Sequence, residues 1–107
     1  MTLLPRSVII GLVIKGFADK ESERLFARQF SKRLPPDIQR SARRKLEVLN
    51  VAKSLDDLRV PPGNHLEKLV GDRKGQHSIR INQRWRICFV WKAGDAYDVA
   101  VVDYHRE

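Results

Sequence analysis

Cysteine is nearly absent from this sequence, which has one, Cys88, and three histidines. A single thiol excludes an internal disulfide framework, and the scattered histidines do not have zinc-finger spacing. Long apolar runs are also missing. The stretch at residues 8–14 is far shorter than the about 20 apolar residues of a membrane span, and a signal peptide needs a longer run followed by a cleavage site. We therefore expect a cytoplasmic protein that does not contact a membrane.

Acidic residues are too few to balance the basic ones. The 21 lysines and arginines exceed the 13 aspartates and glutamates by eight positive charges, in a chain of 107 residues that suits one compact domain. The hydrophobic fraction of 42% excludes a wholly disordered chain. Such a charge excess favours a polyanionic partner, most simply a nucleic acid, or else an acidic protein.

The first half of the chain predicts one strand and two helices. We expect a single domain over residues 13–107 that begins with a β-branched strand, and we interpret residues 1–12 as an N-terminal extension or a lengthened first strand. Asp19 suits the N-cap of a helix of about ten residues with Leu25, Phe26 and Phe30 on its apolar face. Pro35 and Pro36 end that helix and start an amphipathic helix over residues 37–53.

The second half alternates with a period of two. Residues 77–82, 85–91 and 96–104 predict strands joined by short turns, which makes them antiparallel neighbours. In the middle strand Trp85, Ile87 and Phe89 share one face, and Arg86 lies on the other. The predicted fold is α+β, in the order β-α-α-β-β-β, with a helical hairpin packed on one face of an antiparallel sheet.

Most of the positive charge falls in the helical hairpin. Residues 20–53 hold ten basic and four acidic residues, which is six of the eight net charges. A charged helix face can be merely solvated. Because this charge is of one sign and concentrated, we instead interpret Arg40, Arg43 and Arg44 as contacts for RNA phosphates.

Polar residues at the end of the last predicted strand are candidates for acid–base chemistry. Asp103 and His105 project to the same side, and Tyr104 to the other. Such a cluster suits proton transfer on a phosphodiester, although it also fits an ordinary polar strand end. Arg86 is either a solvated edge residue or a fixed cation for a phosphate. The turn at residues 71–75 lacks the spacing of a phosphate-binding P-loop.

The order of several short motifs resembles a known family. The motifs are Ile-Lys-Gly-Phe at 14–17, Leu-Arg-Val-Pro-Pro-Gly-Asn at 58–64, Gly-Asp-Arg at 71–73, Ser-Ile-Arg-Ile-Asn at 78–82, Trp-Arg-Ile at 85–87 and Asp-Tyr-His at 103–105. Together they resemble toxins of the HigB (host inhibition of growth) type, a branch of the RelE superfamily of type II toxin–antitoxin systems. The resemblance covers about residues 13–105.

This resemblance implies a RelE-like fold and a ribosome-dependent endoribonuclease that cuts mRNA in the decoding site and so inhibits translation and growth. It also implies a HigA-type helix-turn-helix antitoxin, through which alone the toxin would meet operator DNA. His105 would then transfer protons, and Asp103 would orient it or share that role. Tyr104 would stack on a base or bind the phosphate. Arg86 would stabilise phosphate charge, with Arg73 as a second cation or a contact for ribosomal RNA. No metal or other cofactor is required.

One position departs from the family pattern. The residue before Gly-Asp-Arg is commonly lysine in this family and here is Val70, which implies that a cation is lost or replaced by Lys68 or Arg73. We expect weaker cleavage if that cation is lost. The alternative function is a basic module of the same fold that binds the ribosome or the antitoxin without cleaving RNA.

Overall fold

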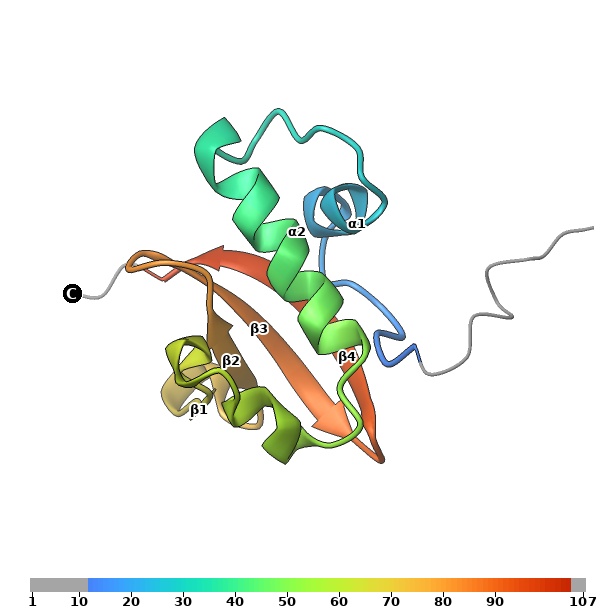
Figure 1. The fold of residues 1–107 in the computed structure, drawn as a ribbon, viewed down its shortest axis with the longest axis vertical. Coiled ribbons are helices and arrows are strands. Elements are labelled where there is room, and N and C mark those ends of the chain that lie inside the picture. The colour runs from blue at the N-terminus through green and yellow to red at the C-terminus, as the bar shows by residue number, and fades with distance from the viewer. Residues whose placement is uncertain (1–11, 105–107) are drawn as a thin grey trace, which may run out of the picture.

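The computed structural model describes residues 12–104, so His105 and nearly all of the interpreted N-terminal extension lie outside the described residues. Two helices, α1 (Lys20–Phe26) and α2 (Pro36–Asn50), precede the strands β1 (Glu67–Lys68), β2 (His77–Arg80), β3 (Trp85–Lys92) and β4 (Asp95–Asp103). The strands form one antiparallel sheet in the order β1-β2-β3-β4. Both helices lie over the same face of this sheet (Figure 1). The predicted α+β class, a helical hairpin on an antiparallel sheet, is confirmed.

The start of the domain differs from the predicted strand. Residues 13–17 make two isolated parallel bridges with β4, at Ile14 and at Phe17, instead of a continuous strand. The Asn50 side chain at the end of α2 accepts hydrogen bonds from the Val13 and Ile14 amides at 3.1 and 3.0 Å, while the Lys15 and Ala18 amides donate to carbonyls of β4. Asp98, in the left-handed region with φ 52°, lies between the two bridges. The short strand β1 was not predicted. The order of regular elements is therefore α-α-β-β-β-β.

The first helix begins as predicted and ends early. The Asp19 carboxylate accepts a hydrogen bond from the Ser22 amide at 2.7 Å, which is an N-cap. The helix ends at Phe26 after seven residues, and Arg28 follows in the left-handed region with φ 65°. The prediction that Phe30 belongs to the apolar face is wrong, since Phe30 lies beyond the helix and is 65% exposed.

The core lies between α2 and one face of the sheet. The amphipathic pattern of α2 is confirmed, since Ile38, Ala42, Leu46 and Leu49 are all buried. They belong to one cluster with side chains that alternate along the strands. The strand members of that cluster that are fully hidden from solvent are Ile79, Ile87, Phe89, Ala96 and Val99.

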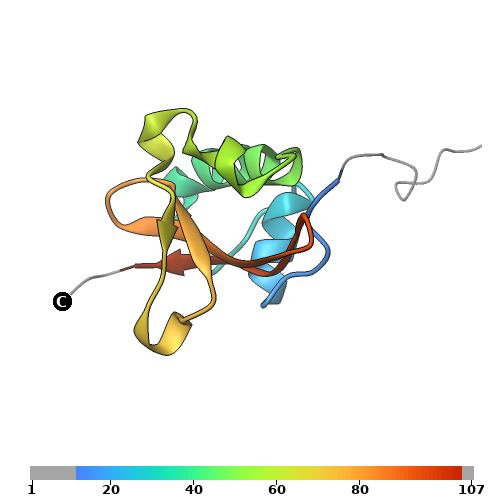
Figure 2. The ribbon, with the colours of Figure 1, turned by 90° about the horizontal axis from the view of Figure 1, so that it is seen from below.

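The opposite face of the sheet carries a different set of residues. Cross-strand register puts Ser78 opposite Cys88 and Arg80 opposite Arg86, and Cys88 in turn lies opposite Ala100 on β4. We call this side, which neither α1 nor α2 covers, the helix-free face. In Figure 2, α2 lies on one side of the strands and the short 3₁₀ helix η4 (Gly71–Arg73) lies on the other.

Candidate functional site

Arg86 is the most firmly held cation of the helix-free face. Its Nε donates a hydrogen bond to the Ser78 hydroxyl at 2.8 Å, and its Nη2 donates to the backbone carbonyl of His65 at 2.5 Å. The residue is 8% exposed, and β3 is an interior strand. The interpretation of Arg86 as a solvated residue at the edge of the sheet is therefore wrong. Its planar fork is fixed by two partners in different elements.

The ring of Tyr104 and the carboxylate of Glu67 complete the surroundings of this guanidinium. The Arg86 Cζ lies 5.7 Å from the centroid of the Tyr104 ring, a cation–π distance. Glu67, half exposed on β1, has its Oε1 3.8 Å from Arg86 Nη2. Sequence reasoning selected Arg86 and Tyr104 but missed Ser78, His65 and Glu67. The alternation of Ser78 with Ile79 was the available signal for Ser78.

Arg73 lies on the same side as Arg86. It belongs to η4, and its Nη1 donates to the Gln76 side-chain oxygen at 3.2 Å. Burial raises the pKa of the Cys88 thiol, and the positive charges of Arg73 and Arg86 oppose that rise. Two cations are thus close enough to act on the same buried sulfur. Arg73 is therefore a candidate for a second cation on this side of the sheet.

Val70 stands where the family commonly has lysine, and Lys68 is a possible replacement for that cation. Neither side chain lies beside Arg86 on the helix-free face. The Val70 side chain is 83% exposed and does not pack against the sheet. Lys68 lies opposite His77, which in turn lies opposite Phe89, so the register puts Lys68 on the helix side of the sheet. Arg73, and not Lys68, therefore shares a face with Arg86.

The end of β4 separates the predicted catalytic residues onto two sides. Asp103 lies opposite Trp85, and both its carboxylate oxygens accept hydrogen bonds from Arg84 at 2.9 Å. This bidentate pair raises the pKa of Arg84. Tyr104 lies beside Arg86 on the other side. The opposed directions of Asp103 and Tyr104 follow from the strand period, while His105 lies outside the described residues.

The arginines of α2 form a separate group on the far side of the sheet from Arg86. Arg40 and Arg44 are exposed. Arg43 is partly buried, and its Nε donates a hydrogen bond to the carbonyl of Leu25 in α1 at 3.1 Å. Arg43 therefore also joins the two helices. The predicted RNA contacts consequently belong to two surfaces, one on α2 and one around Arg73.

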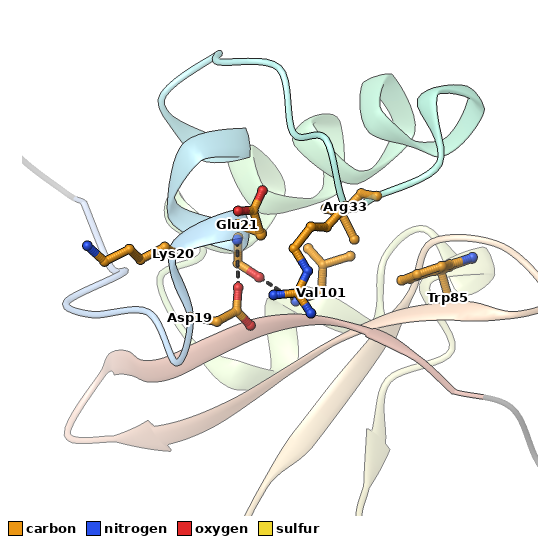
Figure 3. A pocket seen from close by; sticks show the side chains of 8 residues that line it. Asp19, Lys20, Glu21, Arg33, Trp85 and Val101 are labelled. Carbon is orange, nitrogen blue, oxygen red and sulfur yellow. Dashed lines mark hydrogen bonds between the residues drawn. The ribbon is translucent and has the colours of Figure 1, made fainter.

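A cavity of about 550 Å³ opens beside the end of β4 (Figure 3). Its charged lining residues come from α1 and from the loop before α2, and its apolar ones include Trp85 of β3, the cross-strand neighbour of Asp103. Sequence reasoning missed this cavity because distant segments form it. The lining residues are Asp19, Lys20, Glu21, Ser22, Arg33, Leu34, Trp85 and Val101.

Residues 12–104 contain neither a metal-binding cluster nor a membrane-spanning helix. No group of three or more His, Cys, Asp or Glu side chains in this range could hold a metal ion. No helix in the same range is long and apolar enough to span a membrane.

Comparison with solved structures defines the class of fold. The chain resembles a chain of the YoeB–YefM complex from Staphylococcus aureus, with a TM-score of 0.52 and 19% sequence identity, over 89% of this chain and 98% of that one. The protein therefore has the α+β fold of the RelE-like toxins.

Comparison of sequences then narrows the class to a family. The family model for the RelE-like toxin of the type II toxin–antitoxin system HigB matches residues 15–105. Toxin HigB-1 of Vibrio cholerae serotype O1 is 41% identical over 91 residues, which cover 84% of this chain and 95% of that protein. Endoribonuclease HigB of Proteus vulgaris is 31% identical over 93 residues, covering 87% and 100%. The chain belongs to the HigB family of type II toxins, which confirms the resemblance, and its partner is an antitoxin.

Proposed function

We propose that this toxin is an endoribonuclease that cuts translated mRNA on the ribosome. The similar protein from Proteus vulgaris is named an endoribonuclease. The observation that carries the proposal is the fixed guanidinium of Arg86. It is hydrogen-bonded to Ser78 and to the His65 carbonyl, and it lies beside the ring of Tyr104, which directly follows β4. A cation held in advance of the reaction is what stabilises charge that develops on a phosphate.

The chemistry needs one bond formed and one broken at phosphorus. The ribose 2′-oxygen attacks the phosphorus, a 2′,3′-cyclic phosphate forms, and the bond to the 5′-oxygen of the next nucleotide breaks. A base removes the proton of the 2′-hydroxyl, and an acid gives a proton to the leaving oxygen. We assign proton transfer to His105. Asp103 is paired with Arg84 on the other side of the strand end from Arg86, so we assign it no role at the phosphate. Arg86 and Arg73 stabilise the phosphorane charge, and no metal takes part.

The surroundings of this reaction follow from the charge distribution. Arg40 and Arg44 on α2 are free to meet ribosomal RNA phosphates while Arg86 faces the scissile bond, because the two groups lie on opposite sides of the sheet. The target is translated mRNA, so the protein acts in the cytoplasm. The antitoxin is of the HigA type, with a helix-turn-helix domain that contacts operator DNA.

Induced expression of His105→Ala beside the unchanged chain tests the proposal. The unchanged chain should arrest growth and create new RNA 5′ ends inside open reading frames. His105→Ala should lose roughly 100- to 10,000-fold of this cleavage. Lys92→Ala, an exposed position at the opposite end of β3, is the control and should cleave normally. Full cleavage by His105→Ala would refute the assignment of the acid or base.

A non-cleaving module that binds the ribosome or the antitoxin is the second candidate. Exposed Val70 favours it, because an apolar side chain stands beside Gly-Asp-Arg where the family commonly has a cation. The same expression experiment separates the two functions. Growth arrest without new 5′ ends would support binding alone.

A further inference from the structure

Phe30 is an aromatic side chain that the core does not use. It lies in the loop between α1 and α2 and is 65% exposed, whereas the nearby Leu25 and Leu34 are buried. Aromatic rings dominate core and interface energetics because of their large area. The exposed Phe30 ring is therefore available to a ligand.

The loop holds Phe30 in this exposed position through hydrogen bonds to the next residue. Ser31 is fully buried, and its amide donates to the side-chain oxygen of Gln39 at 3.1 Å. The side-chain nitrogen of Gln39 donates to the carbonyls of Ser31 and Leu34, each at 2.8 Å. The Ser31 hydroxyl donates to Glu21 at 2.6 Å. Because both sides of the Ser31 backbone are bound to α2, the ring is presented by an ordered loop.

Cations surround the ring. Phe30 lines a hollow of about 220 Å³ together with Arg24, Lys32 and Glu21. The Glu21 carboxylate is already engaged, by the Ser31 hydroxyl and by Arg24 at 3.6 Å. From position 24 to position 36 the sequence has four basic residues and no acidic one. The patch therefore combines one flat apolar surface with an excess of positive charge.

We propose that Phe30, Arg24 and Lys32 form a binding site for single-stranded RNA, in which an unpaired base stacks on the ring and the flanking phosphates meet the two cations. Stacking on an aromatic side chain within a positively charged surface is how proteins hold single strands without reading their sequence. The site lies on the helix side of the sheet, away from Arg86. This proposal rests on the proposed function in one respect, which is that the ligand is RNA.

Binding of a non-cleavable RNA to the full-length chain tests this site. The probe is a fluorescein-labelled 12-nucleotide single strand of mixed sequence, methylated on every 2′-oxygen so that it cannot be cut. Phe30→Ala should weaken binding by about 5- to 150-fold, and Phe30→Trp should retain it. Lys32→Gln should lower the slope of log affinity against log salt by about 0.7. Val51→Ala is the matched control, because Val51 is also 65% exposed and lies at the end of α2.

The same variants separate the possible sources of the RNA. Weaker binding of Phe30→Ala to empty 70S ribosomes supports the site with ribosomal RNA as the ligand. A defect that appears only on ribosomes carrying mRNA supports it with mRNA as the ligand. Equal affinity of Phe30→Ala and Val51→Ala for the oligonucleotide and for both ribosome preparations would overturn the proposal. So would a defect of Phe30→Ala that is limited to antitoxin binding, which would assign the patch to an acidic peptide.

Binding and cleavage fail separately in this design. If the site is wrong, Phe30→Ala binds RNA normally whether or not the chain cleaves. If cleavage is wrong, the unchanged chain makes no new 5′ ends and Phe30→Ala still loses affinity for the methylated probe. Thermal unfolding of Phe30→Ala should match that of the unchanged chain, since an exposed ring contributes little packing.

Discussion

Strand β3 has two faces that are both buried, one lined by apolar side chains and the other carrying a charged one. Ile87 is fully buried among apolar side chains under α2, and its neighbour Arg86, at 8% exposure, is buried on the other face. The difference lies in the partners, because Arg86 has a hydroxyl and a backbone carbonyl within hydrogen-bond distance where Ile87 has hydrocarbon. Burial by itself therefore does not distinguish core from site. What distinguishes the site is a buried charge whose hydrogen bonds are satisfied by specific polar partners.

The largest effect on stability should come from the helix side of β3. Ile87→Ala should reduce the free energy of unfolding by about 2–5 kcal/mol, because it leaves a cavity in a close-packed core. Urea denaturation followed by circular dichroism measures this. The chain that remains folded should still cleave RNA normally. A loss below about 1 kcal/mol would mean that the core collapses around the missing side chain and that the two faces differ less than their packing indicates.

The matching change on the helix-free face should alter activity instead. Arg86→Lys keeps the charge, yet a single ammonium cannot reproduce the planar fork that spans Ser78 and the His65 carbonyl. We expect cleavage to fall by about 100- to 1000-fold, the loss typical of one transition-state donor. Arg80→Lys is the control, because Arg80 lies directly opposite Arg86 on β2 and is only half-buried. Equal losses in both variants would show that general positive charge, and not a positioned guanidinium, is what matters.

This division of β3 into faces was predictable from the sequence, and the partners of Arg86 were not. A period of two assigns Ile87 and Arg86 to opposite sides whatever the tertiary structure. The His65 carbonyl reaches Arg86 through a backbone in the left-handed region, with φ 44°, and no side-chain pattern encodes that.

The errors at the start of the domain have the same origin. Residues 13–17 have strand propensity, but their pairing with β4 is limited to two bridges on either side of Asp98, which has φ 52°. Phe30 continues the helical spacing of Leu25 and Phe26, yet buried Ser31 and Gln39 fix the loop in another conformation. At Phe30 it is a buried polar side chain from α2 that overrides the local pattern. Such long-range hydrogen bonds leave no periodic signal.

A gain of function is expected from Val70→Lys. The exposed position tolerates the longer side chain, and the new cation joins the turn that carries Arg73. The rate of cleavage should rise. The added transition-state stabilisation should be smaller than the ~3–4 kcal/mol of a buried donor, because solvent and salt screen an exposed charge. Cleavage rates in an in vitro translation reaction measure the gain, which should vanish in combination with His105→Ala. No change in Val70→Lys, together with a loss in Arg73→Ala, would show that Arg73 already supplies the cation.

The smallest effect should come from His77, where β2 meets the edge of the core. Its Nδ1 is buried and has no hydrogen-bond partner among the described residues, and its ring stacks on Phe89 at 6.2 Å between centroids. Burial, and secondarily the charge of Lys68, lowers the pKa of His77. The unfolded chain therefore binds a proton more readily than the folded one. Stability should be complete above the unfolded pKa of about 6.5 and should decline as the pH falls below it.

His77→Phe should flatten this part of the pH profile, because phenylalanine keeps the stacking partner and removes the titrating group. Thermal midpoints measured between pH 7.5 and 5.0 test this, with exposed His65→Gln as the control for a general effect of losing a histidine. Lys68→Gln should remove only part of the slope, since burial is the larger cause of the lowered pKa. Parallel profiles for His77→Phe and the unchanged chain would mean that His77 takes up its proton without cost on the helix side. Burial at that edge of the core would then not disfavour the charged form of His77.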